Sequence, residues 1–454
     1  MPTKKTAQLI ESDKSLIWHP FTQMKDWEKD DILVIEKGDG CYLFDTEGNR
    51  YLDGVSSLWC NVHGHRVKAI DDAVKKQLNQ IAHSTFLGLS NVPAIKLSEK
   101  LIQIAPKGLK RVFYSDSGSE AVEIALKIAF QYWQNRGKRK RTKFIRLTNS
   151  YHGDTIGSVS LGGIDLFHEI FDPLLFKTVK VAAPDYYHDQ FRGSKEEYLD
   201  FCLKRLEKAL KQHANETIAL VMEPLMQGAA GMIDQPKGYI SRARALANQY
   251  NILLIFDEVA TGFGRTGKWF ASDHEKVSPD ILCVAKNLTG GYLPLAATLT
   301  TEKIYRAFLA KHEEFKAFFH GHTFTANPLA CSAAVANLEF FEKQNTIAKL
   351  EPKIKYLGKR LQSFWSLRAV GDIRQVGFMA GIELVKNRLT KQPFEPKEKV
   401  GIRVIKHARK LGVIIRPLGN VIVLMPPLAI SLKELEFLLD VVYESIEEVT
   451  ELSC

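Results

Sequence analysis

A lysine and a carboxylate stand at the ends of two apolar segments in this 454-residue sequence. Lys286 follows the apolar run 281–285, and Asp257 follows the run 252–256. A lysine amine forms a Schiff base with an aldehyde, and a carboxylate keeps a pyridine nitrogen protonated so that the ring accepts electrons. The pair therefore predicts a site for pyridoxal phosphate (PLP) and an enzyme that carries out amine chemistry.

A turn rich in serine and glycine follows the apolar run 111–115 and opens a helical pattern. At Gly118 and Ser119 it offers free backbone N–H groups, a hydroxyl and the positive end of a helix dipole, which together suit a phosphate group. An ordinary helix cap, with Ser117 and Glu120 as a capping box, explains the same residues.

Polar side chains follow two further apolar runs. Tyr151, after the run 143–147, could stack on a planar cofactor ring, and the neighbouring His152 suits a structural role. Glu223 follows the run 217–222 and is explained equally well by an ordinary loop. Neither segment by itself decides between a binding site and a structural turn.

Short apolar runs alternate with helical patterns between residues 65 and 330. This alternation predicts an α/β fold, a mostly parallel sheet covered by helices. Ligands of such sheets bind beyond the carboxyl ends of the strands, where Lys286 and Asp257 stand. The predicted strands are 111–115, 143–147, 217–223, 252–256 and 281–284.

The chain is longer than one hydrophobic core usually serves, so more than one domain is expected. Residues 1–64, with a predicted hairpin at 34–45, form an N-terminal segment that contributes to a small domain and to the active site. Residues 65–330 form the large PLP-binding domain. Residues 331–454 form a smaller α+β domain, with strands predicted at 413–416 and 421–425. Other predicted elements of that domain are a helix at 396–411 and a final helix that begins with a capping box at Ser431.

Composition excludes several classes of protein. The chain is 45% hydrophobic, which is ordinary for a globular protein, and it has no run of about 18 apolar residues that could span a membrane. Residues 1–14 lack the apolar core of a signal peptide, so a cytoplasmic location is expected. The six scattered cysteines, which include Cys454, predict neither a disulfide framework nor a zinc site.

The net charge of +10 raises the alternative of a nucleic-acid partner. The densest basic run, 138–141, is typical of a solvated turn, and no basic stripe with interleaved aromatic residues is present. Small molecules are therefore the expected partners, rather than nucleic acid or a membrane.

Two further motifs suggest other chemistries. Gly262–Gly267 matches the G-x-G-x-x-G pattern of a dinucleotide-dependent dehydrogenase, but no helix start follows it. The same stretch lacks the hydroxyl of a P-loop because Trp269 stands in its place. His320 and His322, like His63 and His65, lack a full set of metal ligands, so no metal site is expected.

Taken together, these segments resemble the class III (ω-amino acid type) PLP-dependent aminotransferases of fold type I, over nearly the whole chain. The resemblance rests on the order of Ser117–Ala121, Tyr151–Gly153, Asp257–Val259, Thr261–Gly267 and Lys286. It implies the type I fold and a ping-pong amino transfer between small molecules. It also implies a homodimer whose active sites are shared between the subunits.

The resemblance also implies roles for particular residues. Lys286 carries the cofactor and moves a proton, and Asp257 pairs with the pyridine nitrogen. Gly118 and Ser119 hold the phosphate, Thr323 reaches it from the partner subunit, Tyr151 lies against the ring, and His322 also belongs to the cofactor site. The residues expected to contact substrate are Phe21, Leu58, Trp59, Tyr151, Gly321 and Arg416, the last as the partner of a substrate carboxylate.

Further motifs resemble the branch of this class that aminates 8-amino-7-oxononanoate in biotin biosynthesis. They include Trp18–Met24, Ser56–Trp59, His320–Phe324 and Arg416–Gly419. Better-known members of that branch take the amino group from S-adenosylmethionine and line the donor site with aromatic residues. This chain has Phe21, Leu58 and Val423 where those members have Tyr, Trp and Tyr, and His322 where they have Pro. A branch with a similar 56–59 motif uses lysine, so both donors stay open, as does an aminotransferase for β-alanine or 4-aminobutyrate.

Overall fold

A seven-stranded sheet forms the centre of the larger lobe (residues 65–344), as the computed structural model shows; the structure describes residues 2–451. Every strand of this sheet except β12 runs in the same direction, which confirms the mostly parallel α/β fold. The strand order is β4 (Leu109–Ser115), β12 (Ala296–Thr301), β11 (Ile281–Val284), β10 (Leu253–Asp257), β7 (Thr217–Met222), β5 (Lys143–Leu147) and β6 (Val179–Val181).

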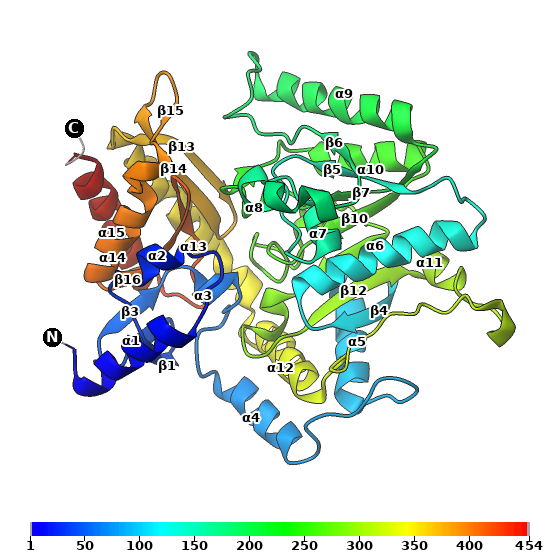
Figure 1. The fold of residues 1–454 in the computed structure, drawn as a ribbon, viewed down its shortest axis with the longest axis horizontal. Helices are drawn as coiled ribbons and strands as arrows, with labels where there is room; N and C mark the ends of the chain where they lie inside the picture. Colours follow the sequence, from blue (N-terminus) through cyan, green and yellow to red (C-terminus); the bar gives the residue numbers. More distant parts are fainter. Residues whose placement is uncertain (1, 452–454) are drawn as a thin grey trace.

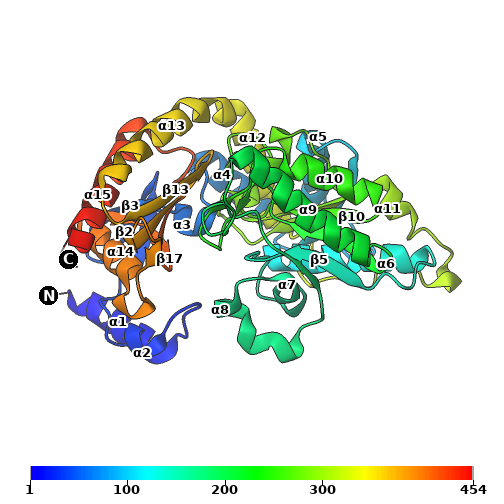
Figure 2. The same cartoon turned by 90° about the horizontal axis from the view of Figure 1, so that it is seen from above.

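Helices cover both faces of this sheet (Figure 2). Successive strand residues point to opposite faces, and on β10 Leu254 belongs to one hydrophobic cluster while Ile255 belongs to the other. One face carries α5 (Val92–Ile104), α9 (Lys195–His213) and α10 (Tyr239–Gln249), and the other carries α6 (Gly118–Asn135) and α7 (Ile156–Leu161). Shorter elements of the larger lobe are α4 (Lys68–Leu78), α8 (Asp165–His168), α11 (Glu302–Arg306), β8 (Met226–Gln227) and β9 (Ile233–Asp234).

The smaller lobe (residues 2–60 and 346–451) lies on the left in Figure 1 and brings the two ends of the chain together. One sheet joins β1 (Ile35–Asp39), β2 (Tyr42–Asp45), β3 (Arg50–Asp53) and β16 (Val413–Ile414). A second sheet joins β13 (Val370–Val376), β14 (Met379–Asn387), β18 (Val421–Leu424) and β17 (Arg416–Leu418), with β15 (Gln392–Pro393) beside β14. The helices are α1 (Lys4–Leu16), α2 (Met24–Trp27), α3 (Ser56–Trp59), α13 (Thr346–Leu361), α14 (Val400–Lys410) and α15 (Leu432–Glu451).

The long helix α12 (Pro328–Gln344) packs on α4 and α5 and leads into the smaller lobe. The predicted domain boundary at residue 331 falls within this helix. Its N-terminus begins at Asn327, whose side chain accepts hydrogen bonds from Leu329 N and Ala330 N.

The structure corrects three predictions. The segment 413–416 is not one strand, because the chain passes from the β3 sheet to the β18 sheet at Ile415. The helix predicted at 396–411 begins only at Val400. The basic run 138–141 is not wholly solvated, since Arg141 is buried, lies over the Trp133 ring and donates to Thr217 O at 2.6 Å.

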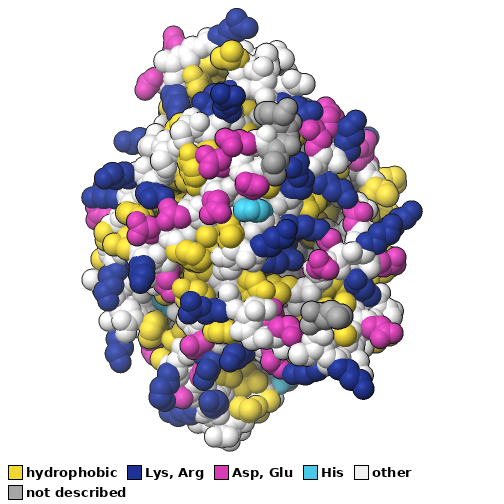
Figure 3. Space-filling model, turned by 90° about the vertical axis from the view of Figure 1, so that its left-hand side faces the viewer, with side chains coloured by type: hydrophobic (Ala, Val, Ile, Leu, Met, Phe, Trp, Pro, Cys, Tyr) yellow, Lys and Arg dark blue, Asp and Glu magenta, His cyan; other side chains and the backbone are white. Residues whose placement is uncertain are grey.

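The surface and the cysteines complete the description of the fold. Figure 3 shows acidic and basic side chains interspersed over the face of the smaller lobe. Among the described residues, no helix combines the length and apolarity that a membrane crossing needs. Cys60 is partly buried and the other described cysteines are buried and free, while Cys454 lies outside the described residues.

Candidate active site

A cavity of about 450 Å³ opens beyond the carboxyl ends of the central strands. It brings together six of the residues singled out from the sequence: Trp59, Gly118, Ser119, Tyr151, Asp257 and Lys286. These side chains come from five separate segments of the chain. The fold therefore assembles the lysine, the carboxylate and the serine-glycine turn around one space.

Lys286 follows β11 after a single residue and begins a short 3-10 turn. Burial lowers the pKa of its amine, although Asp257 and Glu223 oppose this effect. The ammonium position lies 5.2 Å from the centre of the Trp59 ring. A lysine whose pKa is lowered has more of the neutral amine, which is the nucleophilic form.

Asp257 is the last residue of β10, where it pairs in register with Cys283 of β11. Its carboxylate is buried and accepts hydrogen bonds from His152 Nδ1 at 2.7 Å and from Val259 N at 3.0 Å. These two donors hold the carboxylate in one orientation inside the cavity. A buried carboxylate so placed can stabilise a positive charge or a bound proton on a ring nitrogen.

The first turn of α6 forms another wall of the cavity. Ser117 and Glu120 make the capping box, so they serve the helix itself. A Cβ atom on Gly118 would lie only 2.6 Å from Val259, so glycine is required there. Gly153, whose φ is +118°, packs its backbone so closely on Ser119 that a Cβ atom would lie 2.0 Å from Ser119 Oγ. The close packing fixes the position of this helix N-terminus, whose N–H groups suit an anion.

Tyr151 and Glu223 form the wall beside Asp257. The Tyr151 hydroxyl donates to Asp154 at 2.6 Å, and Glu223 accepts from Tyr151 N at 3.1 Å and from Gly228 N at 2.9 Å. Burial raises the pKa of Glu223 to about 7, with the charge of Asp257 adding to this effect and the charge of His152 opposing it. Burial also raises the pKa of Tyr151.

The chemical groups that line the cavity match the functional groups of PLP. The cavity offers a nucleophilic amine for an aldehyde, a fixed carboxylate for a pyridine nitrogen and a helix N-terminus for a phosphate. Sequence reasoning left His152 and Glu223 undecided. Their only signal was their place just after β5 and β7, and the structure brings both to the cavity.

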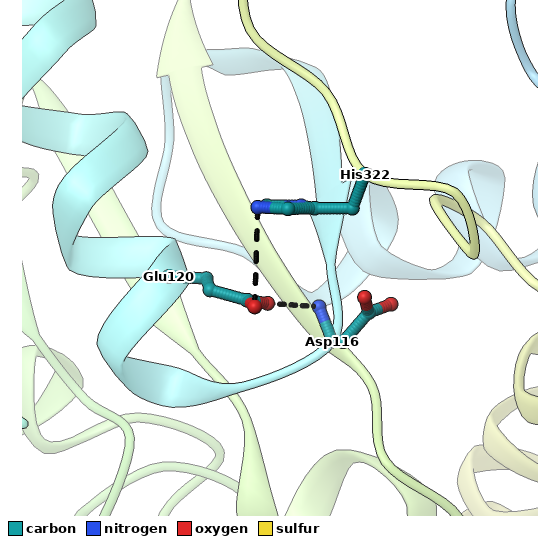
Figure 4. Close-up of side chains that lie close together, drawn as sticks. All are labelled: Asp116, Glu120 and His322. Carbon is teal, nitrogen blue, oxygen red and sulfur yellow. Dashed lines mark hydrogen bonds and ion pairs between the residues drawn. The ribbon is translucent and has the colours of Figure 1, made fainter. Parts of the chain in front are cut away.

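His322 lies near the first turn of α6 and outside the cavity wall (Figure 4). Its Nε2 atom is 3.9 Å from Glu120 Oε1, and Glu120 also accepts from Asp116 N at 2.8 Å. Burial and the charge of Glu120 raise the pKa of Asp116. Asp116, Glu120 and His322 lie close enough together to ligate an ion, but the Glu120 carboxylate already accepts from Asp116 N and Ser117 N at the start of α6.

The other predicted residues lie outside the cavity wall of this single chain. Gly321 and Thr323 are exposed on the loop that carries His322. Phe21 is 57% exposed and contacts Phe167 edge to face, and Leu58 is 50% exposed. Arg416 is exposed on β17. Their roles stay predictions.

Comparisons with known proteins show the family of this chain. A family profile described as class III aminotransferase matches residues 24–446. A protein of Geobacter sulfurreducens named adenosylmethionine-8-amino-7-oxononanoate aminotransferase is 51% identical over 99% of this chain and 100% of its own length. A protein of the same name from Staphylococcus aureus is 46% identical over 99% of both chains.

Solved structures share the fold over the whole length. A crystal structure of an adenosylmethionine-8-amino-7-oxononanoate aminotransferase from Methanocaldococcus jannaschii has a TM-score of 0.93 and 49% identity, covering 98% of this chain and 99% of that one. An ω-transaminase from Pseudomonas jessenii, solved in complex with PMP, has a TM-score of 0.94 and 31% identity, covering 98% of both chains. On this evidence the chain belongs to the class III aminotransferase family.

Proposed function

We propose that this aminotransferase uses PLP to transfer an amino group to 8-amino-7-oxononanoate, giving 7,8-diaminononanoate in biotin biosynthesis. The observation that carries the proposal is the 51% identity, over the full length, with a protein named for that activity. Identity to the ω-transaminase is lower, at 31%. The names of the relatives favour S-adenosylmethionine as the amino donor, and lysine is the alternative because Phe21 and Leu58 alter the donor side of the site.

When bound, PLP supplies an aldehyde for the amine and a ring that accepts electrons. Lys286 would hold the cofactor through its amine, and its Nζ atom would accept and return the proton that the reaction moves. Asp257, held by His152 and Val259 N, keeps a proton on the ring nitrogen. Gly118 and Ser119 would bind the phosphate, and Tyr151 would lie against the ring.

The substrate side of the site is proposed to extend beyond the cavity wall. Trp59, Phe21, Leu58 and Gly321 line the path of the substrates, and Arg416 binds the carboxylate of 8-amino-7-oxononanoate. In a homodimer, the exposed Thr323 would reach the phosphate bound to the partner subunit, with His322 beside it. This arrangement explains why a loop with functional residues stands exposed on one chain.

The role of Lys286 is tested by Lys286→Ala. Reduction of the wild-type protein with borohydride in the presence of PLP should leave the cofactor on the Lys286 peptide, as read by mass spectrometry. The variant should lose this label, and kcat should fall by about a thousandfold or more, as expected when a covalent catalyst is removed. Lys353→Ala removes another partly buried lysine, which donates to Leu428 O, and should keep both the label and the activity. A label on a different lysine would refute the assignment.

The substrates are tested with purified protein and 8-amino-7-oxononanoate as acceptor. Formation of 7,8-diaminononanoate with S-adenosylmethionine or with lysine identifies the donor. Mixed with the protein separately, only the donor that the enzyme uses should bleach the visible absorbance of the bound cofactor. Turnover of β-alanine or 4-aminobutyrate without any diaminononanoate would replace the proposal by an ω-amino acid activity.

A further inference from the structure

Arg265 is a fully buried cation that the proposed chemistry leaves unexplained. It belongs to the loop Gly262–Gly267, and its side chain is 0% exposed. Among the described residues, no carboxylate lies within ion-pair distance of its guanidinium. Burial lowers the pKa of Arg265 to about 10, and the charges of Cys60 and Asp53 oppose this effect. Buried cations are normally paired, so an unpaired one points to a specific task.

The guanidinium links segments that are far apart in the sequence. Nη1 donates to Pro426 O at 2.6 Å, and Nη2 donates to Ser56 Oγ at 3.2 Å. The Ser56 hydroxyl in turn donates to Met425 O at 2.6 Å. A single side chain of the larger lobe thus binds one carbonyl and one hydroxyl of the smaller lobe directly, and that hydroxyl binds the preceding carbonyl.

The segment that receives this contact has an unusual backbone. Ser56, Ser57 and Trp59 have φ angles of +51°, +61° and +63°, which side chains other than glycine adopt only when their surroundings hold them there. The buried Asp53 carboxylate holds one side of the turn, because it accepts from Ser57 N at 2.8 Å and Ser57 Oγ at 2.9 Å. Arg265 holds the other side through Ser56.

This strained turn places the Trp59 ring in the cavity, with Lys286 Nζ 5.2 Å from the ring centre. The loop of Arg265 also contacts the lysine side of the site, since Asn287 Nδ2 donates to Gly262 O at 3.0 Å. The two sides of the Trp59–Lys286 contact are therefore held by the same short loop.

We propose that Arg265 is a positioning residue that holds the turn 56–59 and thereby sets the orientation of Trp59 against the Lys286 amine. The guanidinium fork acts as a fixed spacer between the loop after β10 and the smaller lobe. The expected effect on catalysis rests on the function proposed above for Lys286. The contacts of Arg265 with the turn 56–59 do not depend on that function.

Arg265→Lys tests the proposal in the PLP-loaded enzyme. A lysine keeps the charge but cannot donate to Pro426 O and Ser56 Oγ in the fixed geometry of a guanidinium. We expect kcat/KM for the amino donor to fall about tenfold or more, mainly through KM, as for the loss of one charged hydrogen bond. The Trp59 part of the fluorescence, obtained by subtracting the spectrum of Trp59→Phe in each background, should change as well. Arg141→Lys is the matched control, since Arg141 is a buried arginine that donates to one carbonyl at the opposite edge of the sheet.

A double-mutant cycle separates positioning from general destabilisation. In a Trp59→Ala background, Arg265→Lys should change kcat/KM by less than about twofold, because the residue through which it acts is gone. An undiminished effect in that background, or unchanged kcat/KM and Trp59 emission in the single variant, overturns the proposal. If Arg265→Lys does not fold, Ser56→Ala replaces it in the same cycle. Wild-type protein without PLP on Lys286 would refute the proposed function, and the Trp59 emission would still decide the role of Arg265.

Discussion

Asp257 and Glu258 are adjacent carboxylates with different surroundings. Asp257 faces the cavity and pairs with His152. Glu258 is fully buried and accepts only from uncharged groups among the contacts described: Ala271 N at 2.6 Å, Ser272 N at 3.0 Å and the Thr261 hydroxyl at 3.3 Å. Burial raises the pKa of Glu258 to about 7. The first carboxylate can serve chemistry, and the second closes a turn.

Glu258 should make the stability of the protein depend on pH. Because its folded pKa is raised from 4.5 to about 7, its contribution is fully present below about pH 4.5 and is lost as the pH rises through 7. The loss amounts to roughly 3 kcal/mol of unfolding free energy, as an order of magnitude. Urea unfolding of wild type and Glu258→Gln at pH 5 and pH 8 measures it.

Glu258→Gln cannot ionise, so its stability should fall less than that of the wild type between the two pH values. The variant should be less stable than the wild type at pH 5. Its amide NH2 group cannot accept a hydrogen bond and would face a backbone N–H donor. Parallel pH dependence of the two proteins would contradict the assignment.

Three helices of the protein begin with the same arrangement of a serine and a glutamate. Ser117–Glu120, Ser194–Glu197 and Ser431–Glu434 each form a reciprocal capping box at the start of α6, α9 or α15. In all three, the serine hydroxyl accepts from the glutamate N–H and the glutamate carboxylate accepts from the serine N–H. The same device serves a cavity wall in α6 and surface helices elsewhere, so it indicates a helix start and nothing about function.

Ser194→Ala should lower the unfolding free energy by about 1 kcal/mol, because the first turn of α9 loses its cap. The midpoint of urea unfolding measures the change. Lys204→Ala, at an exposed position of the same helix, is the control and should stay within about 0.5 kcal/mol of wild type. Equal effects of the two substitutions would contradict the role of the cap.

A charged network joins the larger and the smaller lobe. His188 of the larger lobe lies 2.9 Å from Asp185 and 2.7 Å from Glu383 of β14. Arg374 of β13 contacts Glu383 at 2.6 Å and donates to Gly231 O at 2.8 Å. Burial by itself would lower the pKa of His188, but the bonds and charges of Asp185 and Glu383 outweigh it and raise the pKa to about 9.

This network should weaken in alkaline solution. Since the folded pKa of His188 is raised from 6.5 to about 9, its contribution is fully present below pH 6.5 and is lost as the pH rises through 9. His188→Gln should therefore lower Tm at pH 7 and make Tm less dependent on pH between 7 and 10. Differential scanning calorimetry measures both effects, with His407→Gln, a histidine that contacts Ser445 within the smaller lobe, as control. A His188→Gln protein with wild-type Tm at pH 7 would contradict the role of the network.

Much of the larger lobe follows from the sequence because its elements are locally encoded. Strands such as 143–147 and 253–257 are short apolar runs, and helices such as α6 carry a cap and a periodic apolar face. The residues that follow these strands gather at one edge, since parallel strands end together. Lys286 and Asp257 could be placed in one site for this reason alone.

Other features depend on partners that are distant in the chain. β12 consists largely of alanine and threonine, and it becomes a strand between β11 and β4 through their hydrogen bonds. The change of sheet at Ile415 depends on β3 and β18, which lie hundreds of residues apart. Local patterns carry no information about such pairings.

Residue types and short spacings are enough to predict the α/β class, the amine and carboxylate of the site and the resemblance to class III aminotransferases. The contact of His152 with Asp257 and the contact of Arg265 with the turn of Trp59 become visible only in the folded chain. Those contacts join residues 105 and 209 positions apart in the chain, and only folding brings such residues within hydrogen-bond distance.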